Sequence, residues 1–123
     1  MKAAHIRQYP GGRIHMIGIG GSSMSGLAEM LIDQHYQVTG SDRDETYLVH
    51  YVREKNAEVH IGHKAENVHG ADLVVYTAAI PADNPERKEA ERLRVYVLFC
   101  DRSFGDPDIV DRKLGCLFRF RDQ

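Results

Sequence analysis

The chain has 123 residues, which is enough for one domain with a single hydrophobic core and not for two. Hydrophobic residues make up 42% and charged residues 28%, and 16 Lys and Arg against 18 Asp and Glu give a formal charge of −2. This charge balance argues against a nucleic-acid binder. No apolar stretch is long enough to span a bilayer, and two cysteines are too few for a disulfide framework. We therefore expect a cytoplasmic protein without nucleic-acid or membrane partners.

An apolar run followed by a helical repeat opens the predicted fold. Residues 13–17 have the length and apolar character of a β-strand and end abruptly in a glycine-rich loop. After the loop, apolar side chains recur at i, i+3, i+4 and i+7, which predicts a helix that starts at Ser22 or Ser23 with that serine as its cap. The residues that carry this repeat are Met24, Leu27, Ala28 and Leu31.

The rest of the chain continues the alternation of strands and helices. The run at 72–76 is continuous and β-branched, as expected of a central parallel strand covered on both faces. Asn84 and Pro85 mark a helix start, with Asn as the cap and Pro in the first turn. We predict strands at residues 36–39, 57–61, 72–76 and 95–99, with residues 40–42 closing the first of these, and helices at residues 46–54 and 85–93.

This alternation is typical of right-handed βαβ units, whose helices cover both faces of a parallel sheet. We therefore predict an α/β fold, a Rossmann-like three-layer single domain with a parallel sheet of about five strands over residues 13–99. Residues 1–12 are interpreted as an N-terminal arm. Residues 100–123 mix Asp and Arg without a helical period, and we expect this tail to be dispensable for the sheet, although the alternation at 117–121 allows an edge strand.

The loop between the first strand and the first helix has the features of a phosphate site. Gly18 permits a tight turn, and Gly20 and Gly21 have no side chains, so backbone N–H groups can approach a phosphate. The helix that follows points the positive end of its dipole at the same place. The alternative is a strand-to-helix turn without a ligand. On the phosphate hypothesis, replacing Gly20 by Val removes binding and leaves the fold intact. Hydroxyl donors come from Ser22, Ser23 and Ser25.

Asp42 ends the second predicted strand, about where a ribose-binding carboxylate belongs in dinucleotide-binding domains. An Asx turn or a cap for the next helix explains the same residue equally well. An NAD-binding Rossmann domain of an oxidoreductase or redox sensor is therefore one hypothesis, although Ser23 replaces the third glycine of the dinucleotide pattern. His63, at a strand end, is the one histidine expected near the site, and the histidine spacing predicts no metal site.

Four segments, in order and in spacing, carry a resemblance to a known family. They are Ile14–Glu29, Val38–Asp42, Ile61–Asn67 and Thr77–Glu86. Together they resemble the N-terminal part of the bacterial UDP-N-acetylmuramate–L-alanine ligases, the first of the amino-acid-adding Mur ligases of peptidoglycan synthesis. The resemblance fades after residue 97, so residues 100–123 are interpreted as a tail unlike the family.

The resemblance implies that this chain is the UDP-sugar-binding domain of a three-domain ligase, truncated and inactive alone. ATP and Mg²⁺ then belong to the full-length family, and no cofactor or catalytic residue is expected here, because no lysine follows a glycine or precedes Ser or Thr. The expected partner is UDP-N-acetylmuramate or UDP. The implied contacts are Gly18, Gly20, Gly21, Ser22, Ser23, Met24 and Ser25 around the diphosphate, and Asp42, His63, Thr77, Ala78, Ala79 and Ile80 on the uridine side.

Overall fold

The computed structural model describes residues 12–77, 79–101, 110–111 and 116–121. In this part of the chain, seven strands form one sheet in the order β3-β2-β1-β4-β5-β7-β6. The neighbours from β3 to β5 are parallel, and β7 and β6 are antiparallel additions beyond β5. The strands are β1 Arg13–Ile17, β2 Gln37–Asp42, β3 Glu58–Ile61, β4 Leu73–Tyr76, β5 Tyr96–Asp101, β6 Val110–Asp111 and β7 Cys116–Arg121.

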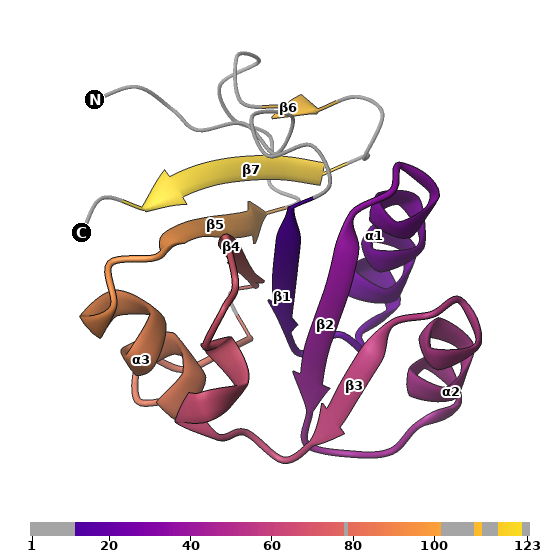
Figure 1. Ribbon diagram of the computed structural model, residues 1–123, viewed down its shortest axis with the longest axis horizontal. Helices are drawn as coiled ribbons and strands as arrows, with labels where there is room; N and C mark the ends of the chain where they lie inside the picture. The colour runs from indigo at the N-terminus through magenta and orange to yellow at the C-terminus, as the bar shows by residue number, and fades with distance from the viewer. Residues whose placement is uncertain (1–11, 78, 102–109, 112–115, 122–123) are drawn as a thin grey trace.

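Helices cover both faces of the sheet (Figure 1). Helices α1 (Ser22–Asp33) and α2 (Tyr47–Glu54) lie on one face, and α3 (Pro85–Arg92) with the 3-10 helix η2 (Ala65–Val68) lies on the other. The predicted Rossmann-like α/β class is therefore confirmed, with five parallel strands from β3 to β5, and the antiparallel strands β7 and β6 extend the sheet to seven. None of the described helices is both long and apolar enough to cross a membrane.

The central strands β1 and β4 supply side chains to two separate cores. Ile14 and Met16 of β1 pack toward α1 and α2, whereas Ile17 packs with Val74 and Tyr76 on the α3 face. Because successive side chains of a strand point to opposite faces, His15 shares the α3 face with Ile17, and it is fully buried. A polar side chain in this position requires a buried partner.

Two local predictions need correction, and a third is confirmed. Helix α1 is capped by Gly21 without a side-chain hydrogen bond, so neither Ser22 nor Ser23 is the cap. Strand β2 continues to Asp42 and includes Gly40, which we expected to close it. Gly40 is needed for packing rather than for a turn, since a Cβ there would lie 2.6 Å from Cδ1 of Ile19. The predicted Asn cap of α3 is confirmed, because Oδ1 of Asn84 accepts two backbone N–H groups.

Strand β7 changes the interpretation of the C-terminal residues. It pairs antiparallel with β5 over five residue pairs, from Val97 with Arg121 to Asp101 with Leu117. The strand predicted at 117–121 is present, but it lies between β5 and β6 and not at the edge. Without β7, the backbone of β5 would lose its partner along one side. This pairing leads us to expect that loss of residues 100–123 destabilises the sheet, contrary to the prediction that they are dispensable.

Proline substitutions at neighbouring positions of β7 test this pairing. Successive N–H groups of a strand point in opposite directions, so one of Phe118 and Arg119 directs its N–H toward β5 and the other directs it away. We expect one of Phe118→Pro and Arg119→Pro to lower the melting temperature by about 4 °C, through the loss of about 1 kcal/mol. The other substitution serves as the matched control and should cost much less. Small and equal effects in thermal unfolding would show that β7 does not stabilise the sheet.

Candidate functional site

The glycine loop forms a tight turn from the end of β1 into α1. The N–H groups of Gly18 and Ile19 both donate to the carbonyl oxygen of Ser41, at 2.8 and 3.0 Å, and the N–H of Gly21 donates to the carbonyl of Gly18 at 3.1 Å. Gly18 has φ +81°, and a Cβ there would also lie 3.2 Å from Cδ1 of Ile80. These backbone groups therefore serve the fold and are not available to a phosphate.

Asp42 closes the same loop from β2. Its Oδ2 accepts the N–H of Gly20 at 2.8 Å, and its Oδ1 accepts the N–H of Asp44 at 3.2 Å in an Asx turn. A Cβ on Gly20 would lie 2.7 Å from Oδ2 of Asp42 and 2.9 Å from Cγ2 of Val49. The Asx-turn interpretation of Asp42 is thus confirmed. Both side chains would have to shift to admit a Cβ, so we expect Gly20→Val to cost stability as well as ligand binding, contrary to the expectation that the fold stays intact.

Three amide groups at the start of α1 remain available. The first intrahelical acceptor, the carbonyl of Gly21, is taken by the N–H of Ser25 at 2.8 Å. The N–H groups of Ser22, Ser23 and Met24 have no acceptor among the described residues, and no acidic residue lies in this first turn. Gly21 and Ser22 are exposed, so an anion can reach this end of the helix dipole.

Two of the expected contact residues have buried side chains. Met24 is 2% exposed and belongs to the core between the sheet and the first two helices. Ser25 is 4% exposed, and its hydroxyl donates to the carbonyl oxygen of Ser22 at 3.1 Å. Met24 can therefore offer a ligand only its main-chain N–H, and the hydroxyl of Ser25 stabilises the first turn.

The segment after β4 reaches the same edge of the sheet. Ile80 packs against the α3-side core, and its carbonyl oxygen accepts from Nη1 of Arg87 at 2.9 Å. The hydroxyl of Thr77 accepts the N–H of the exposed Ala79 at 3.3 Å, and Ala78 lies outside the described residues. The glycine loop, Asp42 and this segment thus all lie at the edge of the sheet where the parallel strands end. This edge is the usual place for a ligand in such sheets.

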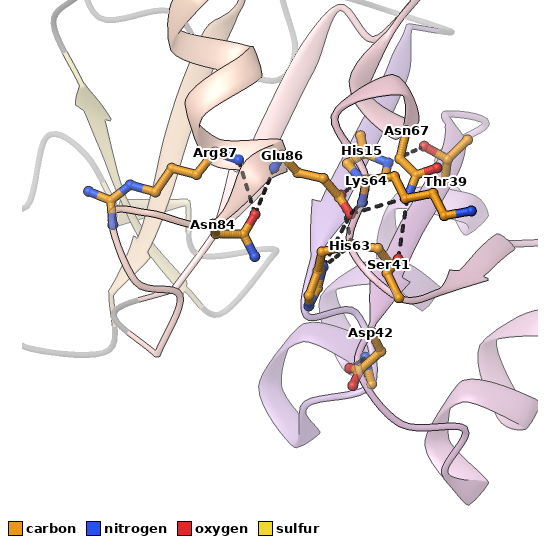
Figure 2. A network of polar contacts seen from close by, with 12 residues as sticks. His15, Thr39, Ser41, Asp42, His63, Lys64, Asn67, Asn84, Glu86 and Arg87 are labelled. Carbon is orange, nitrogen blue, oxygen red and sulfur yellow. Dashed lines mark hydrogen bonds and ion pairs between the residues drawn. The ribbon is translucent and has the colours of Figure 1, made fainter.

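Behind this edge lies a buried carboxylate that no sequence pattern indicates. Glu86, in the first turn of α3, is 0% exposed. Figure 2 shows its carboxylate among polar groups from both neighbouring strands and the loop after β3. Its Oε1 accepts hydrogen bonds from Nε2 of His15 and from Oγ of Ser41, the latter at 2.7 Å. Its Oε2 accepts three more, from Nδ1 of His63 at 3.1 Å, the N–H of Lys64 at 3.1 Å and Nδ2 of Asn67 at 3.2 Å.

These donors decide the charge state of Glu86. Burial alone would raise the pKa of the carboxyl, but hydrogen bonds from His15, Ser41 and Asn67, together with the electrostatic attraction of His15, lower the pKa to about 2. Of the expected site residues that the structure describes, His63 is the one that touches this group, and its side chain is 20% exposed. A histidine inside the apolar run of β1 was the available sequence signal, since a buried polar side chain needs a partner.

Acid titration tests the charge of Glu86. Because the folded-state pKa of about 2 lies below the ordinary value of 4.5, ionised Glu86 stabilises the fold above about pH 4.5. This contribution, on the order of 3 kcal/mol, is lost as the pH falls toward 2. We expect the difference in unfolding free energy between the parent and Glu86→Gln, measured in urea, to shrink between pH 6 and pH 3.

Glu89 provides the matched control for this titration. Its pKa is also lowered to about 2, by hydrogen bonds from Arg92 and His69, but these contacts lie at the surface. Glu89→Gln should therefore change the unfolding free energy little at any pH. A stability difference for Glu86→Gln that stays constant with pH would mean that Glu86 is not ionised in the fold.

Comparisons with known proteins agree on one family. The family model "Mur ligase family, catalytic domain" matches residues 13–100. The UDP-N-acetylmuramate–L-alanine ligase of Alkaliphilus metalliredigens is 55% identical over 82 residues, which cover 67% of this chain and 18% of that protein. The enzyme of the same name from Clostridium beijerinckii is 50% identical over 86 residues, covering 70% of this chain and 19% of that protein. The chain thus spans about a fifth of the length of these relatives.

Solved structures give the same answer. UDP-N-acetylmuramate-alanine ligase from Thermotoga maritima superposes with a TM-score of 0.67 at 36% identity, covering 70% of this chain and 20% of that one. A putative NAD-dependent epimerase/dehydratase from Bacillus halodurans, at 18% identity and a TM-score of 0.55 over 72% of this chain and 50% of that one, shares the fold alone. Since the family model covers more than half of the sequence, the chain belongs to the Mur ligase family.

Proposed function

We propose that this chain binds UDP-N-acetylmuramate through its UDP group, as the substrate-binding domain of an ATP-dependent ligase that adds L-alanine in peptidoglycan synthesis in the cytoplasm. The observation that carries the proposal is the uncapped start of α1, where the N–H groups of Ser22, Ser23 and Met24 have no acceptor among the described residues. Relatives about 50% identical are named UDP-N-acetylmuramate–L-alanine ligases, which supports this substrate.

In this proposal the diphosphate lies on the three free amides and not on the glycine loop. The loop amides are occupied by Ser41, Asp42 and Gly18, so the glycines shape the turn and keep it close to β2. The uridine then lies toward His63 and the segment after β4, on the same edge of the sheet. Asp42 could meet a ribose only through the lone pairs that its Asx turn leaves free.

The proposal assigns residues 13–99 to the UDP-sugar-binding domain, residues 1–12 to an arm and residues 100–123 to a tail unlike the family. The start and end of the family match, at residues 13 and 100, support these limits. Activation of a carboxyl group by ATP and Mg²⁺ is then a task for other parts of the full-length relatives, since no lysine here stands in a phosphate-loop pattern.

Thermal shift with UDP, UDP-N-acetylmuramate and NAD separates the proposal from the NAD-binding alternative. A ligand that binds only the folded state stabilises it by about 2.7 kcal/mol at a hundredfold excess over Kd. We expect UDP and UDP-N-acetylmuramate to raise the melting temperature and NAD to leave it unchanged. A shift with NAD and none with UDP would reverse the assignment.

Ser22→Pro tests the role of the free amides. Proline is favoured at the first position of a helix, and the extended backbone of Gly21 (ψ 153°) suits a residue before proline, so the fold should be retained. The substitution removes one N–H, and we expect UDP affinity by calorimetry to fall about tenfold or more, as for loss of a hydrogen bond to a charged group. Ser22→Ala keeps the N–H and removes the hydroxyl, so it is the matched control. Equal UDP affinity in parent and Ser22→Pro would place the diphosphate elsewhere.

A further inference from the structure

We propose that Glu86 is a positioning residue for His63: it holds the hydrogen of the imidazole on Nδ1, so that Nε2 is presented to the ligand side as a hydrogen-bond acceptor. Nε2 then accepts a hydrogen bond from an N–H or O–H group of the uridine part of the ligand. This inference rests on the proposed UDP site and adds to it a buried residue that touches no ligand.

The partners of Nδ1 fix the position of the hydrogen. Nδ1 of His63 lies 3.1 Å from Oε2 of Glu86 and 3.0 Å from Oγ of Ser41. The hydroxyl hydrogen of Ser41 is already donated to Oε1 of Glu86 at 2.7 Å, so Oγ can only accept from the ring. Both neighbours of Nδ1 are therefore acceptors, and the neutral ring must carry its hydrogen there.

The second ring nitrogen is left for a ligand. Nε2 of His63 has no hydrogen-bond partner among the described residues. It is also not one of the buried polar atoms that lack a partner in this part of the structure, and the His63 side chain is 20% exposed. The preceding Gly62 donates its N–H to the carbonyl of Asp42 at 2.8 Å and has φ +93°, which turns the chain at the end of β3. In Figure 2 the ring of His63 accordingly lies between the Glu86 carboxylate and Asp42.

Glu86 is well suited to hold the ring because it remains an acceptor. Its other donors are His15, Ser41, Asn67 and the N–H of Lys64, and the hydrogen bonds from His15, Ser41 and Asn67 keep the pKa of the carboxyl far below neutral pH. An ionised carboxylate cannot give a hydrogen to Nδ1. A glutamine at the same position could do so, which would move the ring hydrogen to Nε2 and turn the acceptor into a donor.

The test measures the tautomer of His63 by long-range ¹H–¹⁵N spectra of the ligand-free chain at neutral pH, with the signals assigned by His63→Gln. We expect a protonated Nδ1 and an unprotonated Nε2 in the parent. A ring protonated on Nε2 alone overturns the inference without any variant, so the result does not depend on whether Glu86→Gln folds.

Affinity for UDP and the tautomer are then compared in two variants. Glu86→Gln should reduce the Nδ1–H population and weaken UDP binding about tenfold. Asn67→Ala removes a donor to Glu86 and to the carbonyl oxygen of Gly62 but no hydrogen bond of the His63 ring, so it should leave the tautomer unchanged and is the control. Unchanged tautomer and affinity in Glu86→Gln would overturn the positioning role. A parent chain with the expected tautomer but no UDP binding would instead defeat the proposed function and, with it, the ligand half of this inference.

Discussion

The buried carboxylate of Glu86 must receive hydrogen bonds on both of its oxygens, and these hydrogen bonds hold α3 against the sheet. The helix has little apolar surface for the task, since its buried residues are Glu86 and Ala90 alone. Donors from β1, β2, the loop after β3 and η2 meet at the one carboxylate. Removal of a partner from such a group leaves an uncompensated buried charge, which is far more costly than loss of a surface ion pair. The position of the loop that carries His63 therefore follows from polar contacts.

The glycine loop illustrates how a fold and a ligand compete for the same backbone groups. Its N–H groups bond to Ser41, Asp42 and Gly18, which brings β1 and β2 together at the start of α1. Past Gly21, α1 leaves its first N–H groups without partners among the described residues, and these donors remain free. The glycines thus contribute by letting the turn come close to β2, and the anion site that we propose begins with the serines that follow.

Periodicity and apolar runs predicted the strands and helices because each of these patterns is local. Gly40 was misassigned because the sequence does not show that the side chain of Ile19 lies over it. Parallel topology predicts that Asp42, His63 and Ile80 lie at one edge of the sheet. It does not predict which backbone N–H groups there remain without a hydrogen-bond acceptor. His15 and Glu86 were missed as a pair because 71 positions separate them, and a hydrogen bond across that distance leaves no local pattern. Strand β7 was expected from alternation, yet its partner β5 could not be identified.

The antiparallel addition of β7 and β6 gives the sheet two edge strands of different length. Within the described residues, the border beyond β5 ends in the two-residue strand β6, too short to template another chain. The opposite border is β3, which is twice as long and carries Glu58 and His60 on exposed positions. Within the described residues the longer exposed edge is therefore β3, so any strand-to-strand self-association has more backbone to pair with there than at β6.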